Sequence, residues 1–193
     1  MKVILASGSP RRKELLKLVV PQFDVIVSGI DETLQEGLTV TEQVTRLAYI
    51  KAKDIYEKTK GEGDRIIIGS DTIVVKNNKI YGKPKSREHA KQMLHEFLKD
   101  KVHSILTGLC VIVEKDGVCK EYKTYDEIKI FLKDMTDKEI DKWLDTGHAM
   151  DKAGAYAIQD EFCVFIEKVE GNYMTALGLS THKLYDIIKD YID

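Results

Sequence analysis

Apolar and polar positions follow two different periods along this chain. Strands are predicted where apolar residues run together or alternate. They are expected at residues 2–6, 23–27, 65–75, 80–81, 104–114, 118–131 and 161–169. Helices are predicted where apolar residues recur every three to four positions. They are expected from near Pro10 and over residues 39–60, 87–99, 136–147 and 181–191.

Local signals support several of these boundaries. Thr39 with Glu42, and Thr136 with Glu139, have the spacing of a capping box at a helix start. Asp116-Gly117 is a typical hairpin turn. Frequent hairpins among interleaved helices predict an α/β fold with a mixed, partly antiparallel sheet flanked by helices. We expect a single domain over residues 1–193, with two lobes around a central cleft.

Composition narrows the class of protein. The 30 Lys and Arg residues against 32 Asp and Glu residues give a net charge of −2, so no general positive field attracts nucleic acid. No apolar run approaches the roughly 20 residues of a membrane helix, and no targeting segment is indicated. The three cysteines lack a CxxC spacing, and we expect reduced, mostly buried thiols. The sequence therefore predicts a soluble, cytoplasmic protein that binds neither membrane nor nucleic acid.

The loop between the first strand and the first helix is a candidate anion site. Ser9 is expected at the N-cap and Pro10 at the first helical position. Arg11 and Arg12 place two positive charges at the positive end of the helix dipole, which costs ~0.3–1 kcal/mol each. A bound phosphate would offset this cost. Two solvated surface arginines are the alternative interpretation.

Three further positions are candidates for chemistry. Asp71 ends an apolar strand, where it could bind a metal, accept a proton or hydrogen-bond to turn amides. Lys83 precedes a proline and could be functional or simply exposed. Gln159 follows a small-residue stretch, and its amide could bind a nucleobase edge or stabilise a turn. Phosphate-loop, dinucleotide, zinc-protease and serine-hydrolase motifs are absent from the sequence.

Four segments together resemble the Maf family, in matching order over nearly the whole chain. They are residues 5–16, 69–74, 82–84 and 151–159. The resemblance implies a nucleoside-triphosphate pyrophosphatase with a fold like that of the inosine-triphosphate pyrophosphatases. It also implies a homodimer and a divalent cation, Mg²⁺ or Mn²⁺. Loss of pyrophosphate from a nucleotide needs an oriented water and neutralised phosphate charge, which these segments can supply.

The resemblance also implies a role for individual residues. Asp71 would accept the proton of the attacking water, and Glu32 would help Asp71 to hold the metal. The residues that would surround the triphosphate are Ser7, Arg11, Lys51 and Lys83. Arg12, Thr72 and Gln159 match the branch of the family that acts on dTTP and UTP.

Some positions depart from the family pattern, and two other functions remain open. The departures are His148, Ala149, Asp160, Thr175 and Ser180, which we expect to alter the base pocket or its rim. One alternative is a non-catalytic nucleotide-binding regulator of septum formation. The other is a purine pyrophosphatase, of the inosine-triphosphate or the 7-methyl-GTP type.

Overall fold

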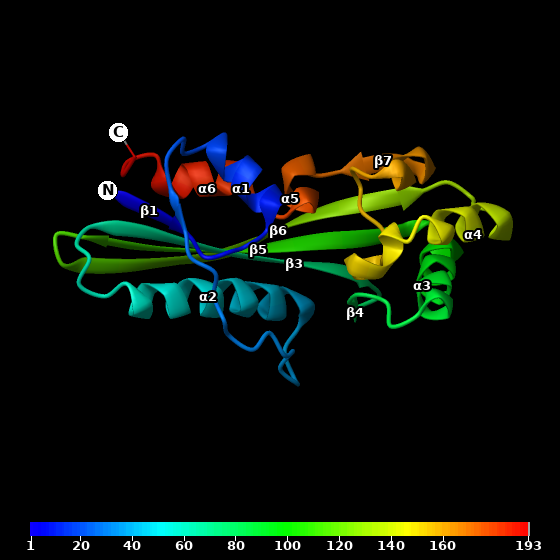
Figure 1. Cartoon of the computed structure of the whole chain (residues 1–193), viewed down its shortest axis with the longest axis horizontal. Coiled ribbons are helices and arrows are strands. Elements are labelled where there is room, and N and C mark those ends of the chain that lie inside the picture. Colours follow the sequence, from blue (N-terminus) through cyan, green and yellow to red (C-terminus); the bar gives the residue numbers. More distant parts are fainter. Residues whose placement is uncertain (193) are drawn as a thin grey trace. The chain divides into compact units, whose positions relative to one another are not determined.

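The chain divides into two units that share three long strands. The computed structural model describes residues 1–192 (Figure 1). Unit 1 contains residues 1–72, 107–126 and the chain from residue 177 onward, whereas unit 2 contains residues 73–106 and 127–176. Strands β3 (Arg65–Lys76), β5 (Val102–Lys115) and β6 (Val118–Leu132) each contribute residues to both units.

Hydrogen bonds connect the strands in the order β2-β1-β3-β5-β6-β7, with β4 beside β3. Parallel and antiparallel pairs both occur, because β1 pairs parallel with β2 and β3, while β3 with β4 and β6 with β7 are antiparallel. The predicted mixed sheet with flanking helices is therefore confirmed. The single domain and the cleft between two lobes stay predictions.

Unit 1 places helices on both faces of its strands. Its own elements are β1 (Lys2–Leu5), α1 (Pro10–Lys17), β2 (Asp24–Val25), α2 (Val40–Lys58) and α6 (Thr181–Ile188). Figure 1 shows α2 on one face of the strands of this unit and α1 with α6 on the other. The capping box predicted at Thr39 and Glu42 begins α2, because each residue bonds the other's backbone amide.

Two glycines allow α2 to lie directly on the strands. A Cβ atom at Gly69 of β3 would lie 2.2 Å from the carbonyl oxygen of Ala48, and one at Gly108 of β5 would lie 2.2 Å from that of Val44. Any larger residue at either position would push the helix away. The apolar residues around this contact are fully buried, among them Ala52 and Ile67. Backbone contact with two strands thus fixes the position of α2 in unit 1.

Unit 2 combines the other ends of the shared strands with short helices. Its elements are β4 (Lys79–Tyr81), α3 (Arg87–Asp100), α4 (Asp137–Asp145), η1 (His148–Asp151), η2 (Ala153–Ala155), η3 (Glu161–Phe165), β7 (Ile166–Glu170) and most of α5 (Tyr173–Leu177). Helix α3 packs against α4 and η2. The core contains stacked or edge-on rings from Phe97, His103, Tyr156 and Phe162. Burial lowers the pKa of His103 to about 3.

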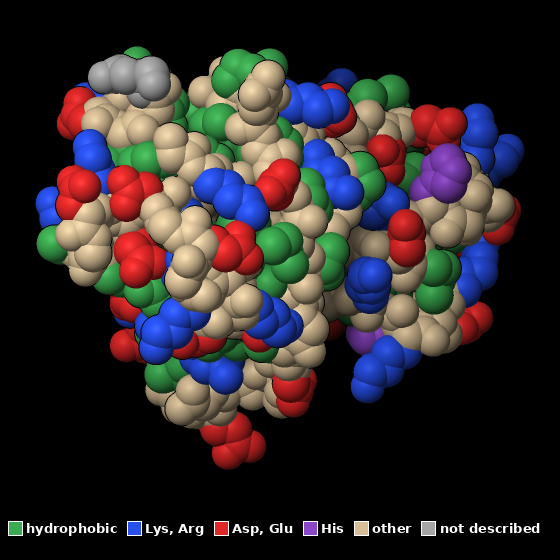
Figure 2. Space-filling model, turned by 60° about the vertical axis from the view of Figure 1, so that its left-hand side comes forward, with side chains coloured by type: hydrophobic (Ala, Val, Ile, Leu, Met, Phe, Trp, Pro, Cys, Tyr) green, Lys and Arg blue, Asp and Glu red, His purple; other side chains and the backbone are tan. Residues whose placement is uncertain are grey.

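Charged side chains of both signs are mixed on the surface. On the face drawn in Figure 2, Lys and Arg side chains lie interspersed with Asp and Glu side chains. The whole chain carries 30 basic and 32 acidic residues of these types, so its net charge is small. An anionic ligand must therefore be held by a local group of cations, because the protein as a whole does not attract it.

Several boundary predictions are wrong in detail. Residues 161–165 form the 3₁₀ helix η3, and only residues 166–170 form a strand. The second predicted strand shortens to Asp24–Val25, and α5 was not predicted. Cys110 is buried, which raises its pKa to about 12, but Cys119 and Cys163 are exposed, contrary to the expectation for most thiols. Among residues 1–192, no helix is long and apolar enough to cross a membrane.

We predict that Gly108→Ala lowers the free energy of unfolding by ~1–3 kcal/mol, because the new methyl group overlaps the Val44 carbonyl. Urea unfolding measures this loss. Gly29→Ala is the matched control, since an added methyl group there meets no atom within 4 Å beyond its chain neighbours, and it should change stability by less than ~0.5 kcal/mol. Equal midpoints for Gly108→Ala and the wild type would show that α2 can move off the strands without cost.

Candidate functional site

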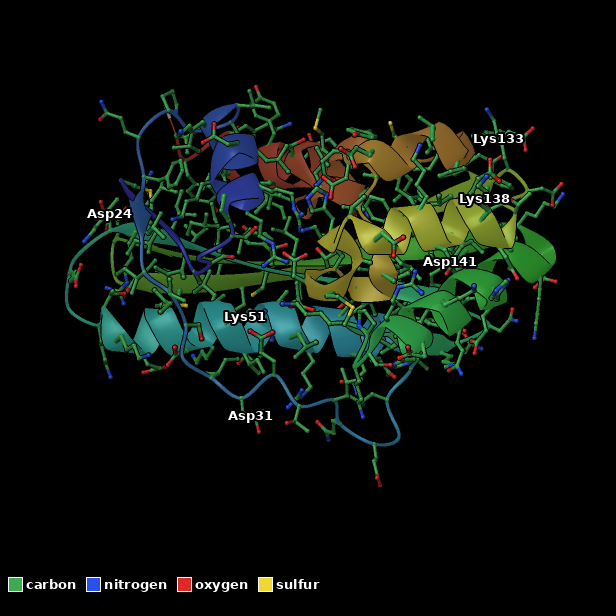
Figure 3. The ribbon with its side chains drawn as sticks, turned by 45° about the vertical axis from the view of Figure 1, so that its right-hand side comes forward. Asp24, Asp31, Lys51, Lys133, Lys138 and Asp141 are labelled. Atoms are coloured by element: carbon green, nitrogen blue, oxygen red, sulfur yellow. The ribbon has the colours of Figure 1, made fainter. Side chains whose placement is uncertain are left out.

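Three charged residues of unit 1 meet where α2 faces β3. Lys51 lies on α2, three residues after Ala48, and Asp71 lies on β3, two residues after Gly69. The Lys51 Nζ atom donates to Asp71 Oδ1 at 2.6 Å and lies 3.0 Å from Glu32 Oε1. Figure 3 labels Lys51 on α2 and Asp31, the neighbour of Glu32, in the loop that passes this helix. The close approach of α2 to β3 thus brings distant sequence segments into one ionic group.

The three side chains differ in their exposure. Those of Lys51 and Asp71 are 9% and 11% exposed, whereas that of Glu32 is 57% exposed. One ammonium therefore faces two carboxylates, and the group carries a net negative formal charge. Such a partly buried pair is costly to break, because the remaining partner would be an uncompensated charge.

The start of α1 forms a second polar group in unit 1. Ser9 occupies the N-cap position before Pro10, as predicted, but its side chain caps no amide. Instead, the buried Ser7 hydroxyl accepts hydrogen bonds from the Ser9 amide at 3.3 Å and from Arg12 Nη1 at 3.2 Å. Arg11 is exposed. The two arginines therefore differ, because Arg11 faces solvent while Arg12 is held by the protein.

Every nitrogen of the Arg12 guanidinium donates to a protein oxygen. Besides the bond to Ser7, Nε donates to the Gly178 carbonyl at 2.9 Å and Nη2 donates to Thr72 Oγ1 at 3.2 Å. Burial lowers the pKa of Arg12, while the negative charges of Asp71 and Glu32 act in the opposite direction. Arginine nevertheless stays protonated in proteins. The result is a fixed, planar cation with N–H bonds left over for a ligand.

Sequence reasoning missed three residues that hold this arrangement. The Gly178 carbonyl also lies 2.9 Å from the Ser70 hydroxyl, and Thr72 Oγ1 lies 2.9 Å from Thr107 Oγ1. Ser70 and Thr107 are fully buried. Gly178 has a φ of +111°, a conformation that side chains disfavour. The only sequence signals were a glycine before the last helix and polar residues within apolar strands.

Lys83 and Gln159 belong to unit 2, and both are exposed. Their two motifs, residues 82–84 and 151–159, are joined by a hydrogen bond of 3.0 Å from the Gly154 amide to the Gly82 carbonyl. The bond to Lys152 and, more weakly, the charge of Lys83 lower the pKa of Asp151. The buried Tyr156 anchors the second motif in the aromatic core. The two motifs are therefore held together within unit 2.

Comparison with known proteins identifies the family. The family described as Maf-like protein matches residues 2–191. The chain belongs to this family.

The curated relatives of this Maf-like chain are enzymes. It is 40% identical to the dTTP/UTP pyrophosphatase of Acetivibrio thermocellus over 99% of this chain and 96% of the relative. It is 42% identical to the dTTP/UTP pyrophosphatase of Alkaliphilus metalliredigens over 97% and 94% of the two chains. Among solved structures, the Staphylococcus aureus Ham1 protein has a TM-score of 0.50 at 13% identity, and the match covers 98% of this chain and 99% of that one. That likeness shows the fold alone.

The five departures from the Maf pattern lie in both units. Ser180 belongs to unit 1, where it is buried and donates to Asp126 Oδ2 at 3.1 Å. The other four belong to unit 2. Ala149 and Thr175 are buried, His148 is exposed beside the Trp143 ring, and Asp160 occupies the N-cap position of η3. The expected effect of these residues on a base pocket stays a prediction.

We predict that Gly178→Ala lowers the free energy of unfolding, because Gly178 lies against the fixed Arg12 guanidinium. A Cβ atom there would lie 3.3 Å from both Arg12 Nε and Thr72 Oγ1, and the backbone conformation alone costs ~1–3 kcal/mol. We expect part of the loss in unfolding free energy to disappear in an Arg12→Ala background. Contacting residues commonly couple by ~0.5–3 kcal/mol.

A double-mutant cycle followed by urea unfolding measures this coupling. Gly61→Ala is the control, because its φ is +88° but no atom lies within 4 Å of the new methyl group. Its effect should add to that of Arg12→Ala. Full additivity for Gly178→Ala would mean that Arg12 does not depend on this glycine.

Proposed function

We propose that this chain is a nucleoside-triphosphate pyrophosphatase that hydrolyses dTTP and UTP to the nucleoside monophosphate and pyrophosphate. The observation that carries the proposal is the group formed by Asp71, Lys51 and Glu32 in unit 1. It joins a carboxylate that can take a proton to a cation that can face phosphate. The full-length similarity to enzymes named dTTP/UTP pyrophosphatase supports this reaction.

Asp71 is proposed as the proton acceptor for the attacking water. Its hydrogen bond to Lys51 uses Oδ1, and no side chain among residues 1–192 donates to Oδ2. This second oxygen is the one that we assign to the water. A positioned general base of this kind contributes roughly 10²- to 10⁴-fold to a rate.

The cations divide into two proposed roles. Ser7, Arg11, Lys51 and Lys83 are assigned to the triphosphate, since charge neutralisation is the main requirement of phosphoryl chemistry. Arg12, Thr72 and Gln159 are assigned to substrate specificity, because their donors and acceptors can pair with a pyrimidine edge. Arg12 fits this role because its orientation is fixed before a ligand arrives.

Glu32 and Asp71 are proposed to hold a divalent cation, Mg²⁺ or Mn²⁺. Two carboxylates fit a hard cation, which commonly takes one or two of them and completes its shell with water and substrate phosphate. Residues 1–192 contain no cluster of three or more acidic, histidine or cysteine ligands, so the remaining ligands would come from elsewhere. When bound, the cation would neutralise charge on the phosphates. We further propose a homodimer, as the Maf resemblance implies, and a cytoplasmic location, as the sequence predicts.

The test is a panel of nucleoside triphosphates with Mg²⁺ or Mn²⁺, in which monophosphate with pyrophosphate is resolved from diphosphate with phosphate. We predict that dTTP and UTP are cleaved well above ATP and GTP. A pocket that hydrogen-bonds a substrate edge can reject a mismatched analogue by ~10⁴-fold. Better turnover of inosine triphosphate or 7-methyl-GTP would favour the purine alternative. Nucleotide binding without turnover would favour the regulator of septum formation.

We predict that Asp71→Asn lowers kcat by ~10²- to 10⁴-fold while the protein still folds and binds nucleotide, because an amide cannot take a proton from water. Asp31→Asn makes the same chemical change beside Glu32, at an exposed residue. It should leave kcat within a few-fold of the wild type. Circular dichroism and thermal melting establish folding for both variants. Near-normal kcat for folded Asp71→Asn would reject Asp71 as the base.

A further inference from the structure

A buried hydroxyl lies behind the proposed specificity residue Thr72. Thr107 of β5 has no exposed surface, whereas Thr72 of β3 is partly exposed. The two Oγ1 atoms are 2.9 Å apart, which is a normal hydrogen bond between hydroxyls. Because Thr107 has no exposed surface, it cannot contact a ligand directly, but its bond to Thr72 can influence one.

The bond to Thr107 limits the hydrogen bonds that the Thr72 hydroxyl can still make. A threonine hydroxyl offers one proton and two lone pairs, so it has three places for partners. Arg12 Nη2 donates to Thr72 Oγ1 and takes one lone pair. Thr107 takes either the proton or the other lone pair. One place remains, and whether it donates or accepts is fixed by the direction of the Thr107 bond.

We propose that Thr107 is a specificity-determining positioning residue, which fixes whether Thr72 acts as a donor or an acceptor toward the nucleobase. This inference rests on the proposed hydrolysis of pyrimidine nucleotides. Uracil and thymine present a carbonyl oxygen where cytosine presents an amino group, so the two edges have opposite hydrogen-bond polarity. A hydroxyl that can only donate, or only accept, distinguishes uracil or thymine from cytosine. Without the Thr107 bond, Thr72 keeps both its proton and one lone pair, so it can pair with the edge of either base.

Loss of the Thr107 hydroxyl should leave the other members of the group in place. Arg12 is still held through Nε by the Gly178 carbonyl and through Nη1 by the Ser7 hydroxyl. Thr72 still accepts from Nη2. These bonds keep Arg12 and Thr72 in place, so we expect the change to act on the polarity of Thr72 and to affect the choice between bases more than the rate on the better one.

The experiment compares kcat/KM for UTP and CTP in the wild type, Thr107→Val and Thr107→Ser. We expect wild type to prefer UTP, and Thr107→Val to lower the UTP-to-CTP ratio roughly tenfold, the effect of one mismatched hydrogen bond. Thr107→Ser keeps the hydroxyl and should restore the ratio. Thr59→Val is the matched control, because Thr59 is also buried and donates to the Ile55 carbonyl at the end of α2. It should leave the ratio unchanged.

Each outcome decides between the inference and the proposed function. An unchanged ratio in Thr107→Val, or a wild type that cleaves UTP and CTP equally, overturns the role of Thr107 and leaves the pyrophosphatase intact. A wild type that cleaves no pyrimidine nucleotide rejects both. If Thr107→Val does not fold, Thr107→Cys is compared with Thr107→Ser, since the two differ by one atom. Equal ratios for that pair would also overturn the inference.

Discussion

The contact between the α2 backbone and strands β3 and β5 is the constraint on which unit 1 depends. Gly69 and Gly108 remove the side chains that normally separate a helix from a sheet, so helix carbonyls lie against the strands. Lys51 follows Ala48 by almost one helical turn, and Asp71 follows Gly69 by one strand repeat. The short Lys51–Asp71 bond is therefore a consequence of backbone packing. A helix held a few ångströms farther from β3 could not make this bond, and Asp71 would lose the cation that offsets its charge.

The polar group of unit 1 combines fixed and adaptable parts. Arg12 has three protein acceptors, and Lys51 and Asp71 are almost covered, so these side chains are ordered before any ligand binds. Glu32 differs because it comes from a loop and its side chain is mostly exposed. That loop is still tied to α2, since Gln43 Nε2 donates to the Gln35 carbonyl at 2.6 Å. Fixed charges lower the reorganisation cost of catalysis, while an exposed carboxylate can adjust to an incoming cation.

Features encoded by a few neighbouring residues could be predicted, but those that depend on distant contacts could not. Both capping boxes and the Asp116-Gly117 turn appear at the predicted positions, because each is a local arrangement of amides. Residues 161–165 are mostly apolar and have the composition of a strand, yet they form η3 around the buried Phe162. Likewise, the Maf motifs indicated Arg12 and Thr72, but Gly178 lies 166 positions from Arg12 and no periodicity connects them. Only folding shows that a glycine carbonyl orients this arginine.

Specificity in this fold is best understood as a property of a few hydroxyl and amide groups. The Ham1 protein has a similar fold at 13% identity, so the architecture persists while most side chains differ. A fold that tolerates such divergence does not by itself select a base. In unit 1, the hydroxyl of the partly exposed Thr72 already has two partners, Arg12 and the buried Thr107. A polar group constrained in this way rejects a mismatched edge strongly, because it cannot rotate to find another partner. Under the proposed assignment of Thr72 to the nucleobase, the residues that set selectivity include those that hold this hydroxyl as well as those that face the ligand.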